Sequence, residues 1–395
     1  MRRAWLIVFA GVAINLCFGV LYSWSVFAEN LRVLYGWPVS LIALPYTTAV
    51  FMFAALMIPG GKIQDRMGPR FAIVLGGILV GSGMILSSFM TTVPGLVVAF
   101  GVLGGSGIGI GYASTAPCAV KWFPPEKKGL ISGLVVAGFG LAPLYIAPLT
   151  TFLVSSIGIA NTFRVFGVGF TVIVVLLGTT FKNPETSPKN ADGTSGSSGG
   201  GHDFTWREMV ATKQFKQLWV MHFAGAMAGL MIIGHLATIV NQQSNGMVMG
   251  AGIVAIAAIA NAVGRPAAGF ISDKLGRTKT MTVIYLAQAL VLVFYSSFST
   301  YVPLLIGACI MTFGYGAMPP IYISVTADFY GLKNLGHNYG IVFSAWGIGG
   351  VTGPQIAGFI TDATGTYQTA FWMAAVLCVV GAMIGFVIKP VDQSA

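Results

Sequence analysis

The chain has 395 residues, of which 55% are hydrophobic and only 8% are charged, whereas soluble domains carry roughly 25% charged residues. This composition excludes a soluble globular protein and predicts a chain that is embedded in membrane lipid. The formal charge of +10 does not indicate nucleic-acid binding, because Lys and Arg fall in short clusters between apolar runs. No aromatic-basic surface on which bases could stack accompanies these clusters.

Continuous apolar runs of about 20 residues, the length that crosses a bilayer, recur along the whole chain. The first run is too long for a signal peptide and no cleavage site follows it, so we expect it to be a spanning helix. Barrel strands are excluded, because the runs do not alternate. We predict twelve spanning helices, at 4–28, 39–60, 71–90, 95–119, 130–156, 161–181, 218–241, 248–270, 280–298, 302–326, 339–361 and 369–388.

The only long polar stretch, 182–216, separates the sixth run from the seventh. It contains a Gly/Ser tract from Gly193 to Gly201, whose composition is typical of a flexible linker, either natural or introduced as a repair. We therefore predict an N-terminal six-helix bundle over 1–181, a cytoplasmic linker over 182–216 and a C-terminal six-helix bundle over 217–395.

The two halves repeat each other. The decapeptide Gly61–Arg70 follows the second run and the related segment Gly269–Arg277 follows the eighth, with Asp65 and Asp273 208 residues apart. A second echo, offset by 207 residues, pairs Lys121–Gly133 with Asp328–Gly340. The predicted fold is an all-α membrane protein of twelve transmembrane helices in two six-helix pseudo-repeats.

The distribution of basic residues predicts the orientation. If the even-numbered connections and both termini share one side, that side holds 18 of the 21 Lys and Arg residues. Arg32 and Arg164 remain on the other side and Arg265 lies within a helix. The asymmetry predicts cytoplasmic termini in a multi-pass protein of the cell (inner or plasma) membrane.

The duplicated loop segment resembles the G-x-x-x-D-(R/K)-x-G-(R/K) motif of the major facilitator superfamily, and the resemblance covers the whole chain. Its charged positions here are Asp65 with Arg66 and Asp273 with Lys274. Each aspartate can accept hydrogen bonds from helix ends or pair with basic neighbours, as a latch between inward and outward states would require. A solvated turn that stabilises one conformer is the alternative.

Four segments narrow this resemblance to the oxalate:formate antiporter family, which is related to the monocarboxylate transporters of animals. They are Tyr22–Phe27, Lys121–Gly129, Asn261–Pro266 and Asn338–Gly340.

Arg265 lies about 17 residues into the eighth run, where an ionised side chain costs some kcal/mol. The acidic residues all lie in loops, in the linker or at helix ends, so we expect Arg265 to bind the carboxylate of an anion with its planar guanidinium. A buried ion pair and snorkelling to the cytoplasmic face are the alternatives. The resemblance supports the first interpretation, because it implies that an arginine at this position is the substrate-carboxylate ligand.

Asn261 lies one turn before Arg265 on the same helix face. It either orients the guanidinium or makes a hydrogen bond between helices. The animal monocarboxylate transporters resemble this segment but have an aspartate at this position, so Asn261 puts a carboxylate proton relay in doubt.

His235 lies in the middle of the seventh run and can titrate near neutral pH. We expect it to carry a proton or bind substrate; a satisfied interhelical hydrogen bond is the alternative.

The resemblance maps the cavity aromatics of oxalate-transporting members onto Tyr22, Tyr112, Tyr315 and Phe343. Glycines flank Tyr315 and precede Tyr112, which lets neighbouring helices approach and lets these phenols point inward. Tyrosines of the core or of the lipid interface are the alternative.

Trp346 determines the predicted substrate class. Oxalate-transporting relatives have a lysine at this position, which gives them two cations for a dianion. With tryptophan here, a second carboxylate would be desolvated and unpaired, at a cost of several kcal/mol. Trp346 and Phe343 can offer an apolar wall for a short alkyl group, although helix packing also explains the tryptophan.

The sequence therefore predicts a secondary active transporter of a small monocarboxylate such as lactate, pyruvate or formate. We expect a monomer in membrane lipid, without a cofactor or metal, coupled to protons through His235 or by net movement of the acid. Anion exchange, including oxalate against formate, is the alternative, and a sensor that binds without transport is a third. The sequence has no acid pair, nucleophile–base pair or metal cluster typical of an enzyme.

Overall fold

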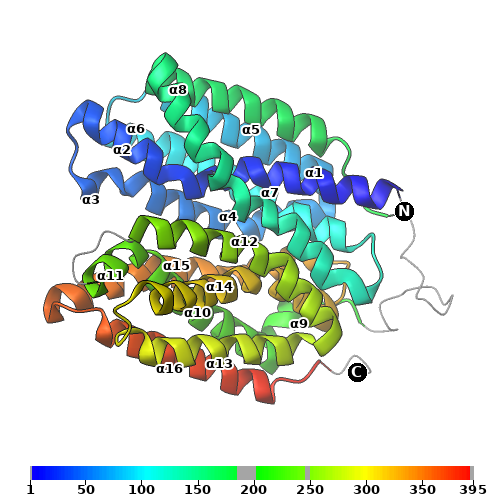
Figure 1. Cartoon of the computed structure of the whole chain (residues 1–395). Helices are drawn as coiled ribbons and strands as arrows, with labels where there is room; N and C mark the ends of the chain where they lie inside the picture. Colours follow the sequence, from blue (N-terminus) through cyan, green and yellow to red (C-terminus); the bar gives the residue numbers. More distant parts are fainter. Residues whose placement is uncertain (1, 185–201, 245–249, 392–395) are drawn as a thin grey trace. The chain divides into compact units, whose positions relative to one another are not determined.

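The computed structural model describes residues 2–184, 202–244 and 250–391, and all the helices and turns of these ranges are drawn in Figure 1. Residues 185–201 of the predicted linker, which include the Gly/Ser tract, lie outside these ranges. The chain folds into two compact units. Unit 1 comprises Met1–Pro124, Leu134–Gly199 and Leu332–Ser344, and unit 2 comprises Pro125–Gly133, Gly200–Gly331 and Ala345–Ala395.

Unit 1 contains the helices of the first half. The bounds are α1 (Arg2–Phe18), η1 (Gly19–Ser23), α2 (Trp24–Tyr35), α3 (Val39–Ile42), α4 (Leu44–Met67), α5 (Pro69–Ser87), α6 (Val93–Leu96), η2 (Val97–Gly104), α7 (Gly105–Val120) and most of α8 (Lys128–Gly178). The long α8 contains one residue with non-helical dihedrals, Gly158 (φ 78°), so it consists of two helices joined at a kink.

Unit 2 begins with η3 (Pro125–Lys127) and the first turn of α8. Its other helices are α9 (Trp206–Ala211), α10 (Lys213–Ile233), α11 (Leu236–Gln243), α12 (Gly250–Leu275), α13 (Arg277–Tyr295), α14 (Tyr301–Tyr330), most of α15 (Leu335–Thr364) and α16 (Gln368–Val387). Within this unit α12 packs along α14, and α13 and α10 pack along α16.

Ten helical segments of the described residues are long and apolar enough to cross a membrane. One of them, Pro125–Gly178, holds the two helices joined at Gly158, and the 30-residue α15 lies outside the ten. The described segments thus account for the twelve predicted runs. The predicted boundaries of the two bundles stay a prediction.

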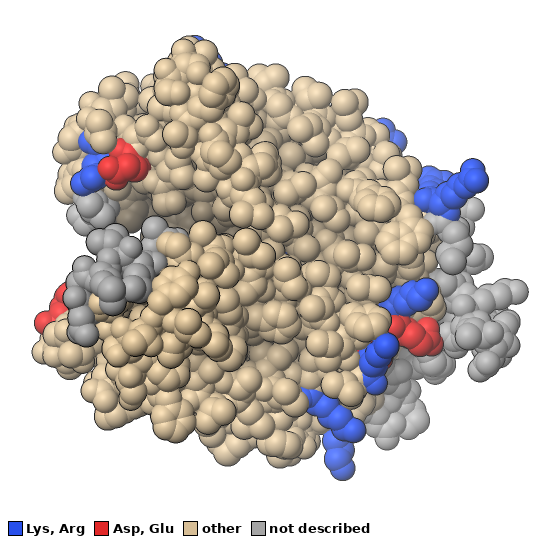
Figure 2. Space-filling view, in the orientation of Figure 1, with Lys and Arg blue, Asp and Glu red and all other residues tan. Residues whose placement is uncertain are grey.

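Large apolar side chains cover the outer sides of the helices. Phe9, Phe51, Leu176, Phe359 and Phe386 each expose at least 60% of their surface, as is expected where the solvent is lipid. On the face seen in Figure 2, the Lys, Arg, Asp and Glu residues lie near helix ends, and the helix sides between them are uncharged.

Three spanning segments depart from α-helix geometry. The first contains the 3₁₀ stretch η1 and the fourth the π-helix η2, while the seventh is interrupted between α10 and α11, at Gly234 and His235. Such irregular turns frequently occur at functional hinges. They place Tyr22 and His235 at backbone interruptions.

Glycines set the distance between helices in unit 1. A Cβ added at Gly105 would lie 2.6 Å from the backbone oxygen of Ala49 and 2.7 Å from its Cα, so α7 and α4 touch backbone to backbone. A Cβ at the preceding Gly104 would meet only the oxygen of Ala99, at 3.8 Å. The neighbouring Gly104 is therefore a matched control for substitutions at Gly105.

We predict that Gly105→Ala lowers stability, whereas Gly104→Ala does not, because only the first forces two backbones apart. Overpacking of this kind costs about 1–3 kcal/mol. Thermal unfolding of the purified protein in detergent measures the difference. Equal unfolding temperatures for the two variants would contradict this account of the α4–α7 contact.

Candidate functional site

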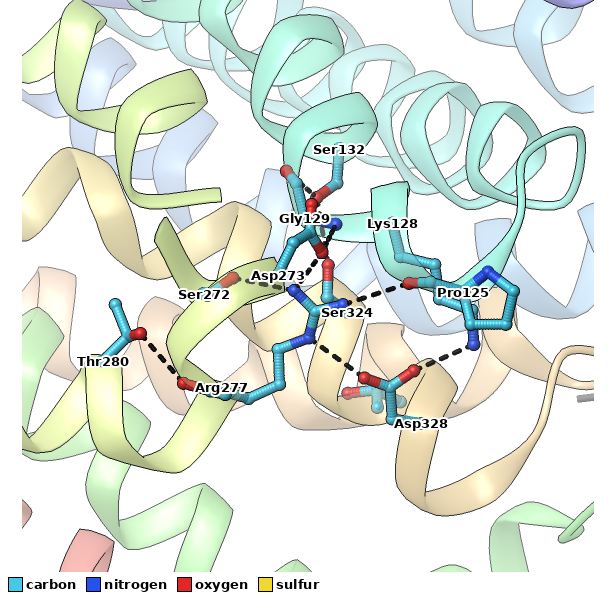
Figure 3. Close-up of polar contacts among 12 residues, drawn as sticks. Pro125, Lys128, Gly129, Ser132, Ser272, Asp273, Arg277, Thr280, Ser324 and Asp328 are labelled. Carbon is cyan, nitrogen blue, oxygen red and sulfur yellow. Dashed lines mark hydrogen bonds and ion pairs between the residues drawn. The ribbon is translucent and has the colours of Figure 1, made fainter. Parts of the chain in front are cut away.

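The Asp273 carboxylate caps the beginning of α8 (Figure 3). One of its oxygens accepts a hydrogen bond from the backbone N–H of Gly129 and the other from that of Leu130, each at 2.8 Å. These N–H groups have no acceptor within their own helix, and a negative charge at this position stabilises the helix by about 0.3–2 kcal/mol. We call this contact the Asp273 cap.

A network of charged side chains surrounds the Asp273 cap. The Arg277 guanidinium pairs with Asp273 and, at 3.0 Å, with Asp328 at the end of α14. The Lys128 ammonium lies 2.9 Å from the other oxygen of Asp328. Two cations and two carboxylates thus balance each other in a partly buried place.

The first half repeats this arrangement. Asp65 accepts hydrogen bonds from the N–H groups of Gly336 (3.3 Å) and His337 (2.8 Å) in the first turn of α15, a contact that we call the Asp65 cap. The Lys121 ammonium lies 3.7 Å from the same carboxylate. Because Gly336 and Gly129 are 207 residues apart, the two caps are counterparts in the internal repeat.

The other charged residues of the predicted latch lie elsewhere. Arg66 is exposed, and the Lys274 ammonium lies 4.4 Å from the ring centre of Phe270. The partners of Asp273 and Asp328 are instead Arg277 and Lys128, which belong to the quoted motifs but were not predicted to pair. The final basic position of the loop motif was the signal for Arg277.

Arg265 is the largest fully buried side chain of the described residues, with 2% of its surface exposed. It lies on α12, and its Nη2 lies 3.4 Å from Oδ1 of Asn261, a long hydrogen bond. The structure therefore brings these two predicted residues together on one helix face. A buried guanidinium beside an amide is suited to bind a carboxylate in a bidentate manner.

The internal repeat shows which residue occupies the position equivalent to Arg265 in the first half. Its counterpart, 208 residues earlier, is Met57, which is also fully buried. The backbone oxygen of Met57 packs against Gly340, and that of Arg265 packs against Gly133, the equivalent glycine in the other half. The fold thus accepts an apolar side chain at this position, so packing alone does not require an arginine.

Tyr315 and Trp346 are hydrogen-bonded to each other in unit 2. The Trp346 indole N–H donates to the Tyr315 hydroxyl at 2.8 Å, and both side chains are buried. The backbone of Gly316, the residue after Tyr315, lies against the backbone oxygen of Asn261. This contact between α14 and α12 brings the turn of Tyr315 beside the turn of Asn261.

Tyr22, Tyr112 and Phe343 belong to an aromatic cluster in unit 1. Tyr112 and Phe343 have ring centres 6.0 Å apart, and Tyr22 joins them through Phe139, at 4.9 Å from Tyr22 and 5.4 Å from Tyr112. Phe53 contacts both Tyr112 (5.2 Å) and Phe343 (5.3 Å). Edge-on and tilted rings at these distances pack favourably.

Two members of this cluster, Phe53 and Phe139, were not predicted. Phe139 stands between Gly138 and Gly140, the same glycine-flanked pattern that pointed to Tyr315. Its counterpart in the repeat is Trp346. Phe53 has no such signal, because its neighbours along α4 are ordinary apolar residues.

Phe343 and Trp346 contact different aromatic residues. The Phe343 ring belongs to the aromatic cluster of unit 1, whereas the Trp346 indole bonds to Tyr315 in unit 2.

His235 joins three helical segments at the interruption between α10 and α11. Its Nε2 lies 2.9 Å from the backbone oxygen of Pro354 on α15, and its Nδ1 lies 3.3 Å from the hydroxyl of Tyr367, just before α16. Because a carbonyl only accepts, Nε2 carries a proton, and in neutral His235 the Nδ1 accepts from Tyr367. Protonation of Nδ1 would reverse the direction of that second hydrogen bond.

The sequence matches the family model of the Major Facilitator Superfamily over residues 4–302 and again over 253–395. It is 28% identical over 394 residues to the oxalate:formate antiporter of Oxalobacter formigenes, covering 98% of this chain and 92% of that protein. It is 24% identical over 371 residues to monocarboxylate transporter 13 of Bos taurus, covering 93% and 84%.

The fold is similar to that of the proton:xylose symporter XylE, with a TM-score of 0.78 and 13% identity, over 98% of this chain and 96% of that one. The predicted twelve-helix fold with two repeats is thereby confirmed.

We predict that Tyr315 and Trp346 are coupled energetically through their hydrogen bond. In a double-mutant cycle of Tyr315→Phe and Trp346→Phe, the two losses of stability should fall short of additivity by about 0.5–1.5 kcal/mol. Thermal unfolding of the four proteins measures this difference. Additive losses would show that the hydrogen bond contributes nothing.

Proposed function

Because the chain belongs to the Major Facilitator Superfamily, a family of membrane transporters, we propose that it is a secondary active transporter of small monocarboxylates such as lactate, pyruvate and formate. Its homologues include an oxalate:formate antiporter and monocarboxylate transporters. The substrate would be an anion, and transport would occur by alternating access.

The proposal rests on the buried Arg265, because the equivalent residue in the first repeat, Met57, is apolar. A charge in the middle of an apolar helix is costly and, when retained, commonly has a functional role. Met57 takes the same packing position in the first half without a charge. We therefore assign to Arg265 the binding of the substrate carboxylate, with Asn261 orienting its guanidinium.

The preference for one carboxylate follows from charge balance. Trp346 and Tyr315 supply hydrogen-bonding groups and aromatic surface but no second cation. A dicarboxylate would therefore leave one desolvated negative charge uncompensated, at a cost of several kcal/mol. Tyr22, Tyr112 and Phe343 are proposed as further substrate contacts.

Anion exchange is the second candidate, since the sequence resembles an oxalate:formate antiporter along nearly its whole length. An exchanger would need a counter-substrate inside the vesicle, whereas a proton symporter would be driven by a pH gradient. His235 is the proposed proton carrier; net movement of the protonated acid would need no such residue.

The Asp65 and Asp273 caps are proposed to act as latches of the transport cycle. Each ties the last turn of one helix, α4 or α12, to the first turn of another, α15 or α8, through backbone amides, so the contact can break without disturbing a helix interior. The protein is proposed to be a monomer in the inner or plasma membrane with both termini in the cytoplasm.

We predict that Arg265→Gln lowers the uptake of labelled lactate into proteoliposomes by at least about 30-fold. Loss of a buried charge that binds an opposite charge costs about 2 kcal/mol or more, which corresponds to this factor. Lys279→Gln removes an exposed cation from α13, outside both caps, and should leave uptake unchanged. Full uptake by a folded Arg265→Gln protein would overturn the assignment.

The coupling mode is tested with His235→Gln. If His235 carries the proton, this variant loses lactate-driven proton uptake but keeps exchange of labelled for unlabelled lactate, because exchange needs no net proton movement. His202→Gln, which changes an exposed histidine, is the control. Unchanged proton uptake by His235→Gln would reject the role of His235 and leave net movement of the acid.

A further inference from the structure

A histidine and two tyrosines that have no part in the proposed function lie close together inside unit 2. His222 on α10 and Tyr322 on α14 are fully buried, and their rings are stacked, with centres 3.9 Å apart and planes inclined by 13°. Tyr285 on α13 is also fully buried, and its hydroxyl lies 3.2 Å from that of Tyr322. We call these three residues the His222 cluster.

The hydrogen bonds of the His222 cluster have a defined direction. The Tyr285 hydroxyl donates to the backbone oxygen of Met221, because a carbonyl only accepts. A hydroxyl has one proton to donate, so the Tyr322 hydroxyl is the donor in its contact with Tyr285. The two hydroxyls therefore connect the ring that stacks on His222 to the backbone of the residue before His222.

The first half of the chain has a small polar pair at the equivalent positions. His222 and Tyr322 correspond, 207 residues earlier, to Asn15 and Thr115. The Asn15 amide donates to the Thr115 hydroxyl at 3.0 Å, so the two positions are in contact in both halves. An amide and an alcohol do not titrate in the physiological range, whereas histidine does. Because the fold accepts the smaller pair, packing alone does not require a histidine here.

The third member, Tyr285, occupies space that glycines provide. Its counterpart 208 residues earlier is Gly77, which lies against Val174. In the second half the sizes are exchanged, because Tyr285 lies against Gly381, the counterpart of Val174. A Cβ added at Gly381 or at Gly225 would lie 2.9 Å from a carbon of the Tyr285 ring. The second half therefore has both the tyrosine and the two glycines that make room for it.

The chemistry of the His222 cluster suits the binding of a proton. Histidine is the side chain whose charge ordinarily changes between pH 5 and 8, and an ionisable residue inside a spanning helix commonly has a functional role. A cation over the face of a tyrosine ring is attracted by the ring's electrons. The stacked Tyr322 presents this face to His222.

The surroundings of the His222 cluster come from several helices. The Cys378 thiol of α16 is a further titratable group beside Tyr285. The side of α15 against α10 has Gly349 and Gly353. Helix α9, which precedes α10, carries the exposed Arg207 and Glu208. The titratable groups that face His222 and its partners are thus a phenol from α14, a phenol from α13 and a thiol from α16.

The His222 cluster shares α14 with the proposed anion site. Tyr315, which is hydrogen-bonded to Trp346, lies seven residues before Tyr322. Seven residues are about two helical turns, so the two rings lie on the same side of α14, about 10 Å apart along its axis. Both pack on α10, Tyr315 against Gly229 and Tyr322 on His222. Charges buried at such a separation are screened much less than charges in water, so a protonated His222 would attract an anion held in unit 2.

We propose that the His222 cluster is a proton-binding site of unit 2, separate from His235, and that its proton strengthens the binding of the substrate carboxylate. The second part of this inference rests on the proposed function and deepens it. His222 holds the proton on its ring, Tyr322 stabilises the cation with its ring face, and Tyr285 fixes the position of Tyr322.

The protonation of His222 is measured directly by nuclear magnetic resonance. The chain has four histidines, and the other three are His202, His235 and His337. Glutamine at these three positions leaves His222 as the single histidine of the full-length protein. The ¹⁵N shifts of its labelled imidazole in detergent are recorded from pH 5 to pH 8. We expect His222 to titrate within this range; a His222 that keeps one protonation state throughout would overturn the proposal.

The link to the anion is measured as the pH dependence of lactate affinity. Binding of labelled lactate to the same single-histidine protein is compared at pH 6 and pH 8, between which a carboxylic acid stays ionised. The affinity at pH 6 should exceed that at pH 8 by at least about fivefold, the lower end of typical coupling between sites. His222→Asn, which introduces the residue of the first half, should bind lactate with a ratio near one. Equal ratios with and without His222 would contradict the link.

Further variants keep the test decisive where a protein does not fold. In the otherwise unchanged chain, His222→Asn should lower the ratio, whereas His202→Gln, which changes an exposed histidine, should keep it. Adding Tyr322→Thr to His222→Asn rebuilds the pair that Asn15 and Thr115 form in the first half. If the unchanged protein binds no lactate at either pH, the proposed function fails, and the titration of His222 still shows whether the proton site exists.

Discussion

The capping of a helix by a distant carboxylate, made twice, is the interaction on which the rest of this structure depends. The first turn of a helix has backbone N–H groups without an acceptor in the same helix, and in each repeat an aspartate in the last turn of α4 or α12 accepts hydrogen bonds from such groups. Glycines at both sides of the contact, Gly61 with Gly336 and Gly269 with Gly129, let the backbones touch. A side chain at these positions would push the cap apart, which explains why the motif pairs glycine with aspartate.

The residues proposed to bind substrate lie at positions where the two repeats differ in sequence. Met57 and Arg265 are equivalent in position and in backbone contacts but differ in charge. Phe53 and Asn261 form a second such pair, one residue in an aromatic cluster and the other beside the guanidinium. One half therefore has apolar side chains, Phe53 and Met57, at positions where the other has an amide and a cation.

Much of the fold could be predicted from the sequence, because apolar runs of bilayer length and a repeated loop motif are local signals. The caps could be predicted only in part. Asp65 and Asp273 were evident, but their partners are the backbone amides of Gly336 and Gly129, respectively, far away in the sequence, and backbone donors leave no signature in residue type. The Tyr315–Trp346 hydrogen bond and the contacts of His235 with Pro354 and Tyr367 depend on helix rotation, which composition does not determine. Arg265 was evident because charge inside an apolar run is rare.

The most direct measurement of the central claim is the thermal stabilisation of the protein by lactate, compared with that of Arg265→Met. This substitution makes the second half like the first, where methionine already fills the position. The account predicts that the variant folds, that lactate raises the unfolding temperature of the original protein and that it no longer does so for the variant, since only a bound ligand stabilises. Equal stabilisation of both proteins by lactate would contradict the assignment of Arg265 as the carboxylate ligand.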